Sequence, residues 1–162
     1  MKQPTNLADL FVIKLKTLYD IEIELVKAIP KMIRKATDEE LAEGLSMHLD
    51  ETKQHVQRLE NIFEMLDVKP GKIKCEAIRG LVADAQWVMD TIEDSILLDI
   101  NICAAAGYIE HYEIAGYTTA YEWASSLDEE EIADILGETL AEEKSANESL
   151  LERSSALITG TL

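Results

Sequence analysis

Two carboxylates lie in a long stretch of the chain that carries no lysine or arginine. Lysine and arginine are absent between residues 80 and 143, and Glu110 and Glu113 fall in an almost uncharged run at 103–117. A carboxylate in a packed interior must be protonated, paired or bound to a metal, because burying it as a bare ion is too costly. We therefore look for the function of the chain first in this stretch.

Three glutamates share a helical face with apolar residues. When each segment is projected as a helix, Glu22, Glu110 and Glu143 fall among apolar positions, whereas Glu113 lies at the margin of its face. Each acid taken alone could instead reach solvent at the end of a bundle. Pairing is the other alternative, and its donors would have to come from other helices. The basic residues available for this are Lys14, Lys27, Arg34 and Arg58.

Two histidines accompany a further acid on the segment after residue 37. His48 and His55 lie three residues before and four residues after Glu51, at the edge of an apolar face on which Glu51 is itself marginal. Taken alone, each histidine is better explained as an exposed or hydrogen-bonded side chain than as a ligand. Their proximity to inward acids makes metal binding the sharper hypothesis.

A site for two metals in a four-helix bundle uses this kind of inventory, with glutamates from four helices and histidines from two of them. Carboxylate and imidazole ligands suit iron(II) or manganese(II). The sequence therefore predicts two iron or manganese ions as cofactors, and the predicted metal ligands are Glu22, Glu51, His55, Glu110, Glu113 and Glu143. A second histidine is missing after Glu143, where Ala146 and Asn147 stand, so the second metal position should be rich in carboxylate.

Helical periodicity dominates the elements that must position these residues, because apolar residues recur at steps of three and four and prolines number only three. The pattern predicts long helices at 7–35, from a capping box at 37–40 to about 66, at 94–125, and from a second capping box at 126–129 onward. A shorter helix is expected at 75–92, and residues 154–162 are expected to be frayed.

The order of these elements predicts the fold class. Short links favour antiparallel neighbours, and one long connection between the second and third long helices is typical of ferritin-like bundles. We expect an all-α, ferritin-like four-helix bundle with a long crossover that carries a short fifth helix. Residues 1–162 should form a single domain, since this length suits one core.

Composition excludes several classes of partner. The chain has 32 acidic and 15 basic residues, a formal net charge of −17, which argues against nucleic acid and anionic membrane surfaces. No segment approaches the roughly 18 to 20 apolar residues of a membrane span. With only Cys75 and Cys103, and no apolar run of a signal peptide at the start, a reduced, cytoplasmic protein is expected.

Several separated motifs, which together span essentially the whole chain, resemble one family. The chain is similar to the YciE/YciF family of bacterial stress proteins, and most similar to its YciF branch. The motifs that carry the resemblance are Leu18–Glu22, His48–Thr52, Lys74–Leu81, Glu110–Tyr117 and Glu138–Lys144.

This resemblance implies a ferritin-like bundle related to rubrerythrin and manganese catalase, usually dimeric, with a di-metal site and expression linked to stress. The site that the resemblance implies comprises Glu22, Glu51, Glu110, Glu113 and Glu143. A homodimer is therefore expected, with Trp87 and Met89 on the crossover helix as a candidate interface.

Two functions stay open at this point. The first is a di-metal oxidase, peroxidase or catalase-like stress protein that handles oxygen or peroxide. The alternative is a non-catalytic helical bundle that binds a partner protein or a little metal, with its acids serving as polar structure. The sequence favours the first function but contains nothing that specifies a reaction.

Overall fold

The structure is a computed structural model that describes residues 3–71 and 73–160, and in these residues it contains helices but no strand. The helices follow in the order α1 (Leu7–Lys35), α2 (Glu39–Met65), α3 (Glu76–Thr91), α4 (Ser95–Ser126) and α5 (Glu130–Thr159). The predicted all-α class is thus confirmed, and α1 continues through Pro30. α5 extends to Thr159, so the expected fraying from residue 154 is wrong over the described part.

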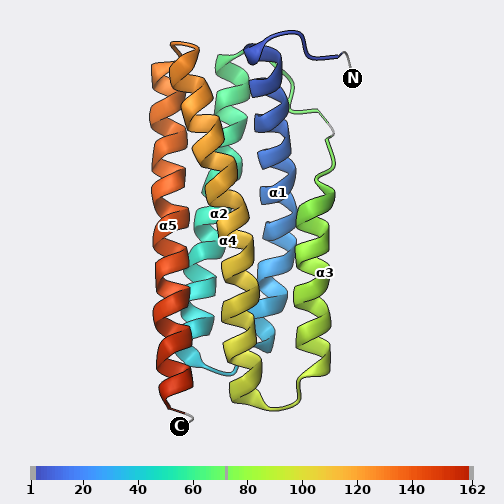
Figure 1. Cartoon of the computed structure of the whole chain (residues 1–162), viewed down its shortest axis with the longest axis vertical. Coiled ribbons are helices and arrows are strands. Elements are labelled where there is room, and N and C mark those ends of the chain that lie inside the picture. Colours follow the sequence, from blue (N-terminus) through green and yellow to red (C-terminus); the bar gives the residue numbers. More distant parts are fainter. Residues whose placement is uncertain (1–2, 72, 161–162) are drawn as a thin grey trace.

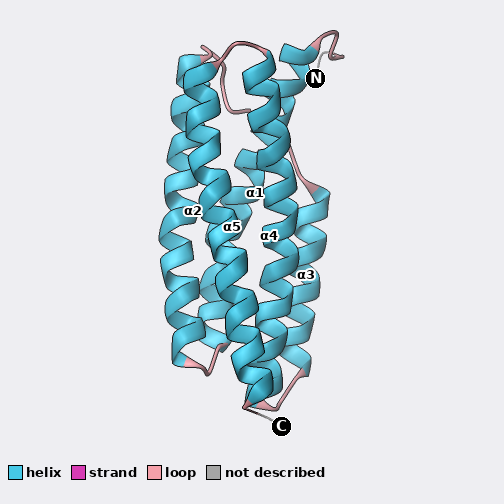
Figure 2. Ribbon diagram, turned by 60° about the vertical axis from the view of Figure 1, so that its left-hand side comes forward, coloured by secondary structure: helices cyan, strands magenta, loops and turns pink. Residues whose placement is uncertain are grey.

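Four long helices form the bundle. α1 packs against α2 and α4, and α5 packs against the same two helices from the other side (Figure 1). The connection from α2 to α4 contains α3, which lies outside the bundle against α1 and α4 (Figures 1 and 2). As a result α2 and α4 begin at the same end of the molecule, and every pair of packed long helices is antiparallel.

Side-chain caps fix the start of three helices. The side chains of Asn6 and Asp38 accept hydrogen bonds from the free backbone N–H groups at the starts of α1 and α2, and Asp94 does so for α4. The predicted capping box at 37–40 is therefore displaced by one residue. Thr37 binds Asp99 of α4 instead, through its backbone N–H at 2.8 Å and its hydroxyl at 2.6 Å.

The second predicted capping box, at 126–129, does not form. Ser126 still belongs to α4, and its hydroxyl donates to the carbonyl of Glu122. The chain reverses two residues later, where Asp128 adopts a left-handed conformation with φ of 60° and Glu129 donates to the carbonyl of Ala124. This backbone cap ends α4 and leaves α5 to begin without a side-chain cap.

The interior face of α2 differs from the predicted one. The sequence pattern places Leu49 and Val56 on the core face, but the buried side chains include His48 and His55 instead. The pattern failed because it counts histidine as polar, although a histidine with partners can be buried. This rotation of the helix directs two imidazoles into the bundle.

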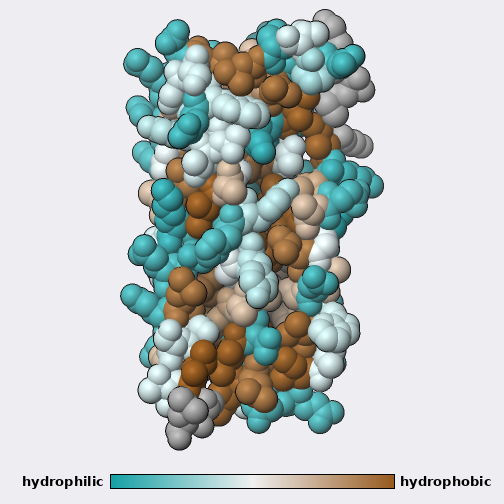
Figure 3. All heavy atoms as spheres, viewed as in Figure 1, coloured by the Kyte–Doolittle hydropathy of each residue, from teal (hydrophilic) through white to brown (hydrophobic). Residues whose placement is uncertain are grey.

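α4 is apolar on nearly all sides. This composition is typical of a helix that is buried, or of one that packs against a further partner. Figure 3 shows apolar side chains gathered over its first half at the surface. Leu97 and Tyr108 of α4 are exposed, as is Trp87 of α3, whereas Met89 is buried in the core and cannot join a surface patch. Among the described residues, no helix is both long and apolar enough to cross a membrane.

Candidate metal centre

Six ionisable side chains converge in the middle of the bundle. They come from all four long helices, and none is more than 8% exposed. α2 and α4 contribute two each, and α1 and α5 contribute one each. The residues are Glu22, His48, His55, Glu110, Glu113 and Glu143.

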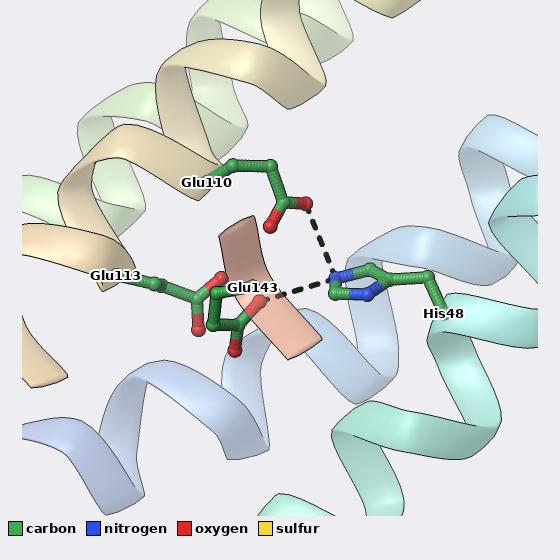
Figure 4. A group of neighbouring side chains, drawn as sticks. All are labelled: His48, Glu110, Glu113 and Glu143. Atoms are coloured by element: carbon green, nitrogen blue, oxygen red, sulfur yellow. Dashed lines mark ion pairs between the residues drawn. The ribbon is translucent and has the colours of Figure 1, made fainter. Parts of the chain in front are cut away.

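These side chains form two groups that share Glu143, and within each group the potential ligand atoms lie within 4.8 Å of one another. In the first group, His48 Nε2 lies 3.1 Å from Glu110 Oε1 and 3.9 Å from Glu143 Oε2, and Glu113 points toward Glu143 (Figure 4). In the second, His55 Nδ1 lies 3.1 Å from Glu143 Oε1 and 3.5 Å from Glu22 Oε1. Glu143 therefore faces one histidine with each oxygen.

Each histidine has a different carboxylate on its other ring nitrogen. His55 Nε2 lies 2.8 Å from Glu142 Oε2, and Arg58 holds both oxygens of Glu142. His48 Nδ1 lies 3.4 Å from Glu51 Oε2. A carboxylate behind an imidazole favours the N–H on that side and leaves the opposite nitrogen with a free lone pair, as in metal sites. The free lone pairs of both histidines would then point toward Glu143, which the two ligand groups share.

Many polar atoms of this cluster have no hydrogen-bond partner. Both oxygens of Glu113 and of Glu143 are unpaired, as are Oε2 of Glu22 and Oε2 of Glu110. His55 Nδ1 also lacks a partner, because its 3.1 Å approach to Glu143 has the wrong geometry for a hydrogen bond. Buried polar atoms are rarely left unpaired without a reason. Oxygen and imidazole donors of this kind match the ligand preferences of iron and manganese, so the residues fit such ions.

The electrostatics of the metal-free cluster are unfavourable for its acids. Burial and then the charges of Glu143, Glu22 and Glu110 raise the pKa of Glu113 well above its usual value. Burial, followed by the charge of Glu110, also raises the pKa of Glu143 to about 7. These carboxylates therefore tend to hold protons unless a cation replaces them.

The pKa values of the two histidines are raised, whereas burial ordinarily lowers the pKa of an imidazole. Burial lowers the pKa of His55, but Glu143 and Glu22 outweigh burial and raise it to about 10. His48 behaves alike, since Glu110 and Glu51 overcome burial and raise its pKa well above the usual value. The site is thus strongly attractive to positive charge.

A tyrosine closes one side of the second group. The hydroxyl of Tyr117 donates to Glu22 Oε1, and Tyr117 is fully buried. Burial and the neighbouring charge of Glu22 raise the pKa of this phenol well above its usual value. The tyrosine stays protonated and orients one oxygen of Glu22, leaving the other oxygen unpaired.

Five of the six predicted ligands meet in this cluster. Glu51 is not in either group, because its side chain is 36% exposed at the rim, where it contacts His48. His48 takes its place in the cluster, although the sequence interpretation did not include it among the ligands. Its spacing of seven residues, or two helical turns, from His55 was the signal that could have placed both on one face.

Comparisons with known proteins agree with this architecture. The chain belongs to the family described as domain of unknown function 892 (DUF892), whose model matches residues 6–161. It is 33% identical to Protein YciF of Escherichia coli (strain K12) over 148 residues, 91% of this chain and 89% of that protein. The resemblance to the YciE/YciF family is confirmed.

Solved structures extend the comparison. The E. coli stress protein YciF has a TM-score of 0.92 at 32% identity, covering 98% of this chain and 99% of that one. YcfI of Rhodopseudomonas palustris has a TM-score of 0.89 at 40% identity, covering 92% and 95%. A protein of Xanthomonas campestris pv. campestris shares the fold, with a TM-score of 0.77 at 21% identity over 96% of each chain.

Proposed function

We propose that this chain is a stress-associated ferritin-like protein whose bundle binds two iron or manganese ions. The observation that carries the proposal is the pair of ligand groups that share Glu143, each with a histidine oriented by a carboxylate behind it. The likeness to YciF, a stress protein of E. coli, supports the association with stress.

The ligand count supports two divalent ions. Four glutamates and two neutral histidines carry a charge that two divalent cations would balance. One ion would take His55 and Glu22, the other His48 and Glu110, and Glu143 would be shared. Glu113 would add a further carboxylate to the His48 group.

Four glutamates and two histidines are also the inventory of di-metal bundles, although it is distributed differently here. The usual motif places a histidine three residues after a glutamate on each of two helices. In this chain Thr52 stands three before His55, and Ala146 stands three after Glu143. His48 would supply the second imidazole from α2, so that both histidines come from one helix.

The helix order supports the ferritin-like assignment. α3 lies in the long connection between α2 and α4, and the packed long helices are antiparallel (Figure 1). This is the arrangement expected of a bundle with one long crossover. Inward side chains on facing helices are where such bundles build metal sites.

Bound iron or manganese would supply redox chemistry toward oxygen or peroxide. The chain's own residues would exclude bulk water, keep His55 and His48 in one tautomer, and hold a proton on Tyr117 beside Glu22. A non-catalytic bundle is the alternative, favoured by the description of YcfI as a candidate structural protein. In that case the carboxylates would simply stay protonated in the core.

Metal content tests the proposal directly. Protein purified without chelator from iron- and manganese-replete cells should contain about two ions per chain. Glu22→Ala, Glu110→Ala and Glu143→Ala should each lower that number, with Glu143→Ala the most severe. Glu138→Ala is the matched control, because Glu138 lies on α5 with its side chain 71% exposed. Wild-type protein with far less than one ion per chain would contradict the proposal.

A homodimer is the assembly that we propose. Exposed apolar residues on α4 and Trp87 on α3 give candidate surfaces for a second copy. Sedimentation equilibrium should give twice the chain mass, and Trp87→Glu should weaken the association if α3 takes part. A monomer at tens of micromolar chain would remove this part of the proposal.

A further inference from the structure

A cavity of about 200 Å³ lies between α2 and α5 and reaches the buried centre at His48 and Glu110. His48 and Glu110 form its inner end, whereas neither Glu22 nor His55 lines it. Small residues line it on both helices, Gly44 on α2 and Ala146 on α5. Its other wall residues are Leu41, Leu45, Met47, Ser145, Ser149 and Leu150.

The mouth of the cavity is acidic. Glu40 and Glu51 line it together with Arg153, and the other basic side chain of the lining, His48, lies at the inner end. Arg153 is engaged by two acids, since its Nε lies 2.7 Å from Asp38 Oδ1 and its Nη1 2.6 Å from Glu40 Oε2. The charge of Arg153 is therefore compensated, and Glu51 is left to face His48 at the inner end.

An unpaired acceptor lies at the inner end. Glu110 is 2% exposed, and its Oε2 has no hydrogen-bond partner. The cavity therefore leads from the half-exposed carboxylate of Glu51 to a buried carboxylate that has a free oxygen. The carboxylates at the two ends of this path are hard oxygen ligands of the kind that divalent cations prefer.

We infer that this cavity is the route by which a hydrated divalent cation reaches the centre, with Glu51 as the first carboxylate that it meets. The inference rests on the proposed two-metal site. A cavity of about 200 Å³ is several times the ~30 Å³ share of one water. A cation can therefore travel through it with part of its hydration shell and lose the remaining waters at His48 and Glu110.

The route also assigns an order of filling. The His48 group is reached first, and the His55 group receives its ion by way of Glu143, since His55 and Glu22 are fully buried. Glu51 then has a role that its position at the rim explains, as the residue that both orients His48 and attracts the incoming ion.

Filling the cavity without touching a ligand tests the route. Gly44 lines the cavity and a Cβ added there meets no atom within 4 Å, so the side chain of Gly44→Leu has room to enter the cavity. Gly80 on α3 is the matched control, because a Cβ there is equally unobstructed and far from the cavity. The measurement is the rate of Mn²⁺ uptake by metal-free protein, followed by electron paramagnetic resonance, together with the final number of ions bound.

Gly44→Leu should slow Mn²⁺ uptake about tenfold or more, with the final number of ions unchanged, whereas Gly80→Leu should load at the wild-type rate. Ala146→Leu fills the cavity from α5 and should act like Gly44→Leu. Wild-type loading rates in both cavity variants would overturn the route while leaving the two-metal centre intact. Absence of Mn²⁺ binding in wild type would instead overturn the proposed function, and the route with it.

Discussion

The two ends of the buried centre have nearly the same composition but different surroundings. Each end pairs one histidine of α2 with a glutamate of another helix, and Glu143 lies between them. At the closed end, His55 is fully buried and Glu142 lies 2.8 Å behind it, held by Arg58. At the open end, His48 borders a cavity, and its partner Glu51 is farther away at 3.4 Å.

This difference separates two tasks that a buried metal site must combine. Firm hydrogen bonds hold ligands in place before a metal arrives, but a fully enclosed site exchanges nothing with solvent. Here the His55 end has the firm support and the His48 end has the opening. We interpret the first as the more rigid position and the second as the position where ions and small ligands exchange.

Removing either histidine should have the largest effect and should separate the two ends. His55→Ala and His48→Ala should each lower the metal content from about two ions to about one per chain. Added imidazole should restore the lost ion in His48→Ala, because the cavity admits it, but should not restore it in His55→Ala. The measurement is metal content by mass spectrometry after incubation with imidazole and Mn²⁺.

The comparison between the two ends would be broken if imidazole rescued both histidine variants equally. It would be broken equally by rescue of His55→Ala alone, since that result would place the opening at the wrong end.

Removing the carboxylates behind the histidines should have a smaller effect on metal binding than removing the histidines. Loss of such a partner typically costs 10- to 100-fold in metal affinity. Glu142→Ala should fall near the upper figure, because Glu142 is close to His55 and is held by Arg58, and Glu51→Ala should fall near the lower one. Competition with a Mn²⁺ chelator measures both affinities.

Glu138→Ala is the control for that experiment, because Glu138 lies 3.8 Å from Arg58 but does not contact His55. A variant that weakens Arg58 pairing alone should keep the wild-type affinity. Equal losses in Glu51→Ala and Glu142→Ala would show that the two ends are supported alike.

Stability of the metal-free protein should depend on pH through both ends. The pKa of Glu143 is raised from 4.5 to about 7, so the folded chain binds more protons than the unfolded one between these values. The pKa of His55 is raised from 6.5 to about 10, which has the same sign over its own range. The unfolding free energy of metal-free protein should therefore fall as pH rises from about 4.5 to about 10.

Chemical denaturation of chelator-treated protein at a series of pH values measures this slope. Glu143→Gln should reduce the slope between pH 4.5 and about 7, where the raised pKa of Glu143 acts, whereas the part that comes from the raised pKa of Glu113 should remain. Added Mn²⁺ should stabilise the protein more strongly at higher pH, since the ligands must lose protons to bind metal. Rising stability of the metal-free protein over this range would contradict the charge balance described for the core.

Most of the fold could be predicted from the sequence, because helical periodicity and segment length suffice to place five helices. The ends of the helices were harder, since Asp128 ends α4 by a left-handed backbone conformation that competes with the capping pattern at Ser126. The inward glutamates on α1, α4 and α5 were recognisable because apolar neighbours define those faces unambiguously. They are Glu22, Glu110 and Glu143.

The histidines of α2 show what periodicity alone could not decide. Leu49 and Val56 offered an apolar stripe as regular as the one that contains His48 and His55, so only the packing of the other helices selects the rotation. Once four carboxylates occupy the centre, burying imidazoles opposite them is favoured by charge. The rotation of α2 therefore depends on the carboxylates of three other helices, and the sequence of α2 alone does not reveal it.

The most direct test of the proposed two-metal centre is anomalous diffraction at the manganese edge from crystals grown with Mn²⁺. We predict two peaks, about 3.5–4 Å apart, on either side of the Glu143 carboxylate. One should lie within bonding distance of His55 Nδ1 and the other within bonding distance of His48 Nε2. Manganese found only at surface carboxylates, with no peak between α1, α2, α4 and α5, would contradict the account.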